Sequence, residues 1–373
     1  MDLLRLFGMF CVVYAHCFFH GVRTGTYGVV SSVYVIPLFI FSSGYFYRTE
    51  QDQSGWVFLR RTAKKCLLPY FIWNMIYGLI HEVLTIMGII QFGERLSLYT
   101  LLIAPWSSGA QFMLNIASWF LVSLFLVTTG TWIVRKVLTR LCPMDGRMEL
   151  LLLVLFYVIG VLGVFLAGQA QYHYGWKGGI LRPLVLLPYY QLGIVYRKYR
   201  DRLPGKRIVW IGILIVLIPL LPLCNGQAFM TRMLYCYFEG APPLLVLTAT
   251  GCVLLIMEVC GLLGRFVDRI GAIHYAGRCT MHIMLHHLFL LYCIQMFWFL
   301  VNHIWPLPDY NSARFHTDFW YHFSFGHTWV TWVYAILIFI LPIVCHYIYQ
   351  RIILRLDDRL CGKSAQNLHS GTQ

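Results

Sequence analysis

Residues 3–20 read LLRLFGMFCVVYAHCFFH, an apolar run that carries Arg5 near its start and His16 near its end. At about 1.5 Å per residue the run makes a helix of about 27 Å, which is close to the thickness of the hydrocarbon core of a bilayer. An ionisable side chain inside such a helix is costly and is a functional candidate by default. The stretch therefore predicts a membrane-spanning helix with two residues that need an explanation.

The composition of the whole chain agrees with a membrane protein. Of 373 residues, 59% are hydrophobic and only 12% are charged, whereas a soluble domain carries about 25% charged residues. Too little polar surface remains to coat a soluble globule, which excludes a soluble enzyme, a secreted disulfide-stabilised domain and a disordered chain. The sequence predicts an all-α polytopic membrane protein with one domain over residues 1–361, followed by a polar, disordered cytoplasmic tail over 362–373.

Each membrane span needs about 20 mostly apolar residues. The sequence contains ten such runs, so we expect a single bundle of about ten transmembrane helices. The predicted spans are 3–20, 29–48, 66–90, 113–134, 149–167, 183–197, 207–223, 240–260, 275–301 and 328–350. The sixth is short and is interrupted by Pro183 and Pro188, and residues 224–242 are expected to add structure at the membrane interface.

Lysine and arginine residues mark one side of the membrane. The net charge is +14, from 29 basic and 15 acidic residues, and the basic residues gather in alternate connections between the apolar runs. Two of these clusters are Arg60, Arg61, Lys64 and Lys65, and Arg197, Lys198, Arg200 and Arg202. Because basic connections stay in the cytoplasm, this distribution predicts that both termini lie there. The expected partner is thus the lipid bilayer and not a nucleic acid.

The 12 cysteines are scattered, mostly within apolar runs, without a Cys-x-x-Cys pair, which is typical of small residues in a helix core. Cys224 and Cys236 fall in one external connection, and the sequence does not decide whether they form a disulfide. His282 and His286 are spaced i, i+4 and could share a helix face, but no carboxylate or further ligand completes a site around them. No metal is therefore predicted.

The spacing of Arg5 and His16 indicates a ligand-binding stripe. Eleven residues at about 100° each end about 20° past three full turns, so both side chains share one helix face, with a rise of roughly 16 Å between them. Arg5 would hold the phosphates of a coenzyme A thioester, whose long arm would bring its carbonyl to His16. Imidazole is suited to accept a proton from a hydroxyl near neutral pH. The alternative is an arginine that marks topology and a histidine that packs between helices.

Further candidates lie around this stripe. The basic cluster 60–65 either cradles phosphates beside Arg5 or only anchors the topology. Glu82 lies at roughly the depth of His16 and could orient it, although structural hydrogen bonding is the more common role. The connection 302–327 is rich in His, Trp, Phe and Tyr, which stack on sugar rings and also sit at membrane interfaces. The remaining candidates for lining a substrate cavity are Ser43, Tyr45, Trp119 and His287.

Five segments, taken in chain order, resemble acyltransferase family 3, a family of integral-membrane O-acyltransferases, and most closely its fucose 4-O-acetylase-like branch. They are Asp2-Leu-Leu-Arg5 with His16, the run Pro37-Leu-Phe-Ile-Phe-Ser-Ser-Gly44-Tyr45, the basic stretch 60–65 before Pro69-Tyr70, Trp119-Phe120-Leu121, and residues 277–287 with His287. Each motif alone is weak, but five in register are strong. Arg278 and Cys279 depart from the family pattern, in which Lys and Asn are common.

The resemblance implies an enzyme that moves an acyl group, usually acetyl, from cytoplasmic acetyl-CoA to a hydroxyl of a cell-surface or lipid-linked glycan. His16 would be the catalytic base, Arg5 and the cluster 60–65 would bind the donor, and the other candidates would contact substrate. The sequence does not decide whether the acyl group is transferred directly or through an acyl-histidine intermediate. The protein would lie in the bacterial cytoplasmic membrane, as a monomer or a homo-oligomer.

Two other functions fit a polytopic membrane protein. A transporter or flippase for a lipid-linked sugar would show inverted repeats and paired discontinuous helices, whereas this sequence shows one span interrupted by proline and no repeat. A membrane acyltransferase that acts on lipid or protein would have its buried histidine late in the chain, as His286 or His287 is. That function would leave Arg5 and His16 unexplained.

The charge distribution makes a testable prediction about topology. A reporter that works only outside the cytoplasm should be inactive when it is fused after Gln373 and active when it is fused near Gly175, because most lysine and arginine residues lie in the connections on the side of Gln373 and few lie in those on the side of Gly175. Activity after Gln373 with none near Gly175 would contradict the predicted orientation.

Overall fold

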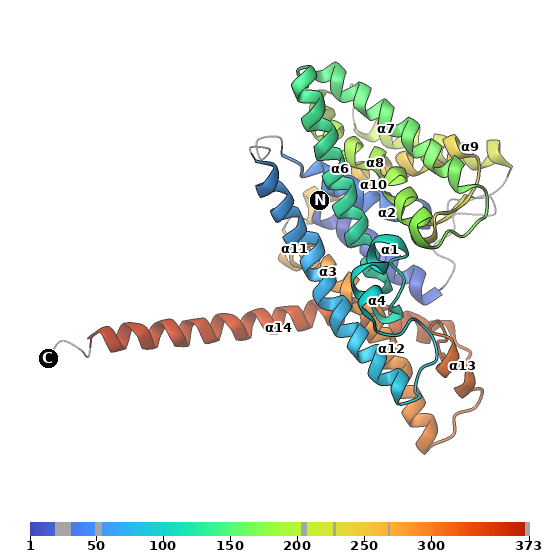
Figure 1. Ribbon diagram of the computed structural model, residues 1–373, viewed down its shortest axis with the longest axis vertical. Helices are drawn as coiled ribbons and strands as arrows, with labels where there is room; N and C mark the ends of the chain where they lie inside the picture. The colour runs from blue at the N-terminus through green and yellow to red at the C-terminus, as the bar shows by residue number, and fades with distance from the viewer. Residues whose placement is uncertain (19–30, 49–53, 203–206, 227–228, 268, 370–373) are drawn as a thin grey trace.

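The structure, a computed structural model, describes residues 1–18, 31–48, 54–202, 207–226, 229–267 and 269–369, and it is largely helical (Figure 1). The long helices are α1 (Asp2–Phe18), α2 (Ser32–Tyr45), α3 (Gly55–Ile86), α6 (Trp119–Leu141), α7 (Gly146–Ala167), α8 (Gly175–Tyr199), α9 (Arg207–Asn225), α10 (Pro242–Val267), α12 (Thr280–Ile304) and α14 (Thr328–His369). The short helical segments are α4 (Leu98–Leu102), α5 (Ala104–Ser107), η2 (Met113–Ser118), η3 (Arg200–Arg202), η4 (Met233–Tyr235), α11 (Gly271–Arg278) and α13 (Ser312–Thr317).

Within the described ranges, six helical stretches are long and apolar enough to cross a membrane. They are α3, η2 together with α6, α7, α10, α12 and the first part of α14, while α2 and α9 are apolar but shorter. The predicted class, a helical membrane protein, is thus confirmed. α1 and α8 are also predicted spans but are not among the six; both carry basic residues, Arg5 in α1 and Lys177 and Arg182 in α8.

Several helices depart from their predicted bounds. α3 begins at Gly55, so the basic cluster 60–65 lies on the helix itself and not before it. α8 keeps Pro183 and Pro188 inside a continuous helix, because neighbouring helices re-satisfy backbone groups that a proline frees in a membrane protein. The predicted span 275–301 divides at Cys279 into α11 and α12. α14 continues to His369, through most of the segment where a polar tail is predicted.

The backbones of α2 and α8 lie in direct contact near the end of α2. A Cβ atom added to Gly44 would come within 1.9 Å of the carbonyl oxygen of Tyr190, and one added to Gly193 would come within 2.2 Å of the carbonyl oxygen of Phe41. Only glycine fits at both positions, which is the small-residue packing expected of membrane helices. The Ser-Ser-Gly end of α2 therefore serves close helix packing, and α8 lies between α2 and α7.

The start of α1 packs against α11 in a similar way. A Cβ atom added to Gly277 would lie 2.5 Å from the Cβ atom of Asp2, and Nδ1 of His274 lies 3.0 Å from a carboxylate oxygen of Asp2. α1 also packs against α2, α12 and α14. In Figure 1, α7 to α10 gather in the upper part of the view, α12 and α13 lie in the lower part, and α14 projects away from both.

A buried ion pair joins the end of α6 to the start of α7. Both terminal nitrogens of Arg135 donate to the Glu149 carboxylate, at 2.7 and 2.9 Å, and the amide of Gln191 on α8 donates to the same carboxylate at 2.8 Å. The side chains of Arg135 and Glu149 are 3% and 4% exposed. Three helices are thus fixed to one another by a single carboxylate.

A β-hairpin lies between α9 and α10, in the region predicted to add interfacial structure. β1 (Met230–Arg232) pairs antiparallel with β2 (Tyr237–Glu239), with Thr231 opposite Phe238. Cys236 is buried beside this hairpin, whereas Cys224 is exposed and both thiols are free. These two described residues therefore do not form a disulfide with each other.

The Arg135–Glu149 pair makes a testable prediction about stability. Glu149→Ala leaves a buried guanidinium without its carboxylate, which typically costs about 3–5 kcal/mol. We expect a clear loss of melting temperature of the variant in detergent. The matched control is Asp201→Ala, which removes a carboxylate that is 90% exposed and paired with Arg200, and it should change little. Equal melting temperatures for the two variants would contradict a stabilising role for the buried pair.

Candidate active site

Helix α1 places Arg5 in its first turns and His16 in its last turn, and each side chain meets a different neighbour. Nε of Arg5 donates a hydrogen bond to the Ser42 hydroxyl at 2.9 Å, and its guanidinium lies 4.8 Å from the centre of the Phe46 ring. Both partners belong to the end of α2. Arg5 is therefore held at the end of α2 by Ser42, the residue before the predicted Ser43.

His16 pairs with His287 of α12. Nδ1 of His16 lies 2.9 Å from Nε2 of His287, and the two rings are stacked with centroids 5.0 Å apart. Nδ1 of His287 lies 2.8 Å from the carbonyl oxygen of Ile283 and 3.0 Å from that of Met284. His287 is fully buried, whereas His16 keeps part of its surface exposed. The structure thus brings two of the predicted site residues into direct contact.

The hydrogen bonds around His287 fix which nitrogens of the neutral pair carry protons. A carbonyl oxygen only accepts, so Nδ1 of His287 must donate and its Nε2 must hold a lone pair. That lone pair accepts from Nδ1–H of His16. In neutral His16 the remaining nitrogen, Nε2, consequently holds a lone pair. His287 thereby presents His16 in the tautomer that a general base needs.

The connection between α13 and α14 covers this pair. Trp320 stacks on His16 with ring centroids 5.6 Å apart and an angle of 20°, and His322 lies near enough to His16 for their charges to interact. The sequence shows that the connection 302–327 is rich in aromatic residues and histidine, but it does not show that the connection contacts His16. Trp320 and His322 are therefore site residues that sequence reasoning missed.

The basic cluster 60–65 is exposed near the start of α3. Arg60, Arg61, Lys64 and Lys65 are exposed on α3, and Arg61 lies over the Phe58 ring at 5.8 Å. Within the described residues, no hydrogen bond or ion pair links any of the four to Arg5. The role of this cluster in binding the donor thus stays a prediction.

Two other candidates, Glu82 and Tyr45, have partners other than His16. Glu82 binds Arg95 and accepts a hydrogen bond from the backbone of Leu96 at 2.9 Å, so His287 and not Glu82 orients His16. The Tyr45 hydroxyl accepts from Arg200 at 2.9 Å.

Ser43 and Trp119 are likewise held by neighbours. Ser43 donates to the Phe39 carbonyl of its own helix at 3.0 Å. Trp119 is buried, with the Arg182 guanidinium 5.7 Å from its ring. These contacts hold both side chains within the helix packing.

The other histidines of α12 face away from His16. Nδ1 of His286 lies 2.7 Å from the Tyr77 hydroxyl, and His282 stacks on His346 with centroids 3.8 Å apart. Among the residues that the structure describes, no group of three His, Cys, Asp or Glu side chains is arranged to hold a metal ion.

A comparison with protein families gives one match. The family model of the acyltransferase domain, acyltransferase family 3, matches residues 1–351. No curated protein matches the chain, and no solved structure does.

Proposed function

The chain belongs to acyltransferase family 3, and we propose that it is a membrane O-acyltransferase of the fucose 4-O-acetylase-like branch. It would take an acetyl group from cytoplasmic acetyl-CoA and transfer it to a hydroxyl of a cell-surface or lipid-linked glycan. The enzyme would work in the bacterial cytoplasmic membrane. The observation that carries this proposal is the hydrogen-bonded chain from the Ile283 carbonyl through His287 to His16.

In the proposed reaction, Nε2 of His16 accepts the proton of the acceptor hydroxyl. The hydroxyl oxygen attacks the thioester carbonyl carbon, the carbon–sulfur bond breaks, and the coenzyme A thiolate leaves with the proton that His16 returns. As His16 becomes imidazolium, its Nδ1–H still donates to neutral His287, so the new charge is stabilised without a rearrangement of partners. Arg5, at the other end of α1, would attract the anionic part of the donor.

The same geometry admits an acyl-histidine intermediate. In that route Nε2 of His16 would attack the thioester carbonyl carbon, the carbon–sulfur bond would break and the coenzyme A thiolate would leave. The acceptor hydroxyl would then attack the acetyl group on the imidazole, the nitrogen–carbon bond would break, and the hydroxyl proton would go to the thiolate. We favour direct transfer, because it needs only one proton carrier at His16. Incubation with labelled acetyl-CoA without acceptor separates the two routes, since only the second leaves label on the peptide that contains His16.

His16→Gln tests the chemical role of the imidazole. Glutamine retains a polar group but accepts no proton at neutral pH, so the rate should fall by about 10²–10⁴, the usual contribution of general-base catalysis. Donor affinity and melting temperature should stay near those of the wild type. His282→Gln on α12 is the matched control and should keep its activity. Acetyl transfer by His16→Gln within about tenfold of wild type would mean that His16 is a packing residue.

His287 is a positioning residue in this proposal, and two substitutions test it. His287→Leu leaves Nδ1–H of His16 without an acceptor, and an unsatisfied buried donor costs about 1–3 kcal/mol, so kcat should fall about ten- to a hundredfold. His287→Gln offers an amide oxygen and should restore part of kcat. The KM for acetyl-CoA should be unchanged in both. Equal losses of kcat in the two variants, accompanied by equal losses of melting temperature, would indicate a purely structural role.

A further inference from the structure

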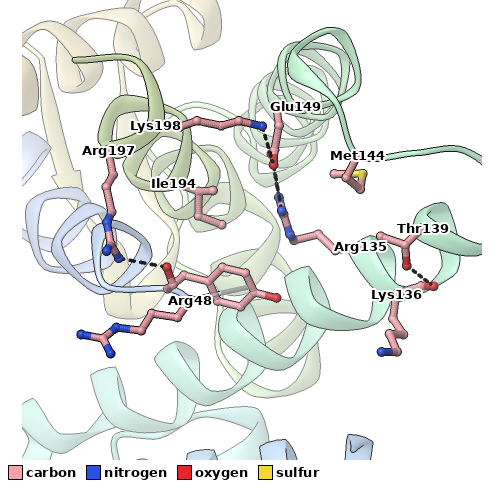
Figure 2. A pocket seen from close by; sticks show the side chains of 10 residues that line it. Arg48, Arg135, Lys136, Thr139, Met144, Glu149, Ile194, Arg197 and Lys198 are labelled. Carbon is pink, nitrogen blue, oxygen red and sulfur yellow. Dashed lines mark hydrogen bonds and ion pairs between the residues drawn. The ribbon is translucent and has the colours of Figure 1, made fainter. Parts of the chain in front are cut away.

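A basic pocket of about 810 Å³ opens where the ends of α2, α6, α7 and α8 meet (Figure 2). Its charged lining consists of Arg48, Arg135, Lys136, Arg197, Lys198 and Glu149. These residues lie on the face that the distribution of lysine and arginine assigns to the cytoplasm. The volume falls in the range of about 300–1,000 Å³ that is typical of small-molecule sites.

The charges of the pocket are strongly unbalanced toward positive. Five basic side chains face one carboxylate, Glu149, which is already bound by Arg135 and lies 3.8 Å from the ammonium group of Lys198. Figure 2 shows this group on one wall, with Arg197 and Arg48 on the opposite side. Since the one carboxylate cannot neutralise five cations, the pocket suits a ligand that carries more than one negative charge.

Two arginines keep hydrogen-bond donors available for such a ligand. Nη1 of Arg197 donates to the carbonyl oxygens of Tyr45 and Tyr47, both at 3.3 Å, which holds the side chain while its Nε and Nη2 make no hydrogen bond to the residues described. Arg48 is exposed and has no acidic partner in the described part of the chain. A guanidinium offers a planar pair of N–H groups that matches phosphate, so these two side chains favour a phosphorylated ligand.

The pocket adjoins the Arg5 end of the candidate active site. Phe46 lies under the Arg5 guanidinium, and the next residue, Tyr47, lines the pocket, with its ring 5.3 Å from the Arg135 guanidinium. The residues that follow α2 thus contact Arg5 on one hand and line the pocket on the other. The exposed cluster 60–65 has no such connection among the described contacts.

We propose that this pocket binds the phosphate groups of the acyl-CoA donor, with Arg48 and Arg197 as the main contacts. The inference rests on the proposed function, because it takes the donor from there. It assigns to the pocket the role that the sequence gave to the cluster 60–65. The headgroup of an anionic phospholipid has the same chemistry, so the test must distinguish a soluble donor from a membrane lipid.

The test measures coenzyme A affinity by calorimetry on the purified full-length protein in nanodiscs of phosphatidylcholine, which has no net charge. Arg48→Ala and Arg197→Ala should each weaken binding by about ten- to a hundredfold, as expected for the loss of a charge-assisted contact. Arg140→Ala is the matched control, because Arg140 is exposed on α6 one turn beyond Lys136 and does not line the pocket. Inorganic pyrophosphate should compete with coenzyme A in the wild type and less in the two pocket variants. Arg48 lies outside a helix and keeps the test valid if Arg197→Ala fails to fold.

Unchanged coenzyme A affinity in both pocket variants would overturn the inference. If the two variants also lose co-purifying phosphatidylglycerol in native mass spectrometry, the pocket binds a lipid headgroup and not the donor. The proposed function fails separately: wild-type protein that binds no coenzyme A would refute the donor itself. If the wild type binds coenzyme A and the pocket variants bind it equally well, the donor stands and only the proposed role of the pocket is refuted.

Discussion

A polar group inside a bilayer must find its partner within the protein, because no water is present to replace it. Three ionisable residues of the described interior follow this constraint. Arg135 is bound by Glu149 and Gln191, Arg182 by the backbone carbonyls of Gly178 and Ser107, and His16 by His287. The contacts of Arg135 with Gln191, of Arg182 with Ser107 and of His16 with His287 join residues that are 56, 75 and 271 positions apart. The polar residues therefore determine which helices meet, while the apolar residues fill the space between them.

The candidate site is positioned by such pairings and by close backbone contacts. Gly44 and Gly193 allow α2 to touch α8, and that contact fixes the end of α2, where Ser42 and Phe46 hold Arg5. The same end of α2 supplies a wall of the basic pocket. A larger residue at Gly44 would therefore displace the surroundings of Arg5 and the pocket together, although glycine contacts no ligand itself.

The sequence predicted the position of each site residue along its helix better than its direction around the helix axis. Position along a helix follows from position within an apolar run, and Arg5 and His16 occupy opposite ends of α1 as expected. Direction depends on how each helix is rotated against its neighbours, which a single sequence does not contain. For this reason Glu82 faces Arg95 and not His16, and Arg5 meets Ser42 and not Ser43.

The sequence could not predict that His287 orients His16, nor that the basic residues line one pocket, for a related reason. The partners His16 and His287 are 271 positions apart, so no local pattern reveals that one orients the other. The pocket takes its residues from four helix ends, and each basic residue read alone is adequately explained as a topology marker. Only their convergence around one cavity makes a binding role the better explanation.

The cover over His16 has a consequence for the chemistry. Water competes with the acceptor hydroxyl for a thioester, and general-base catalysis by His16 would accelerate both reactions unless access is controlled. Trp320 stacks on the His16 ring, so one face of the base is closed by an aromatic surface. His287 occupies Nδ1, which leaves Nε2 as the only basic nitrogen of neutral His16. A hydroxyl must therefore approach along the plane of the ring, where binding of the acceptor, and not diffusion of water, can decide which molecule reacts.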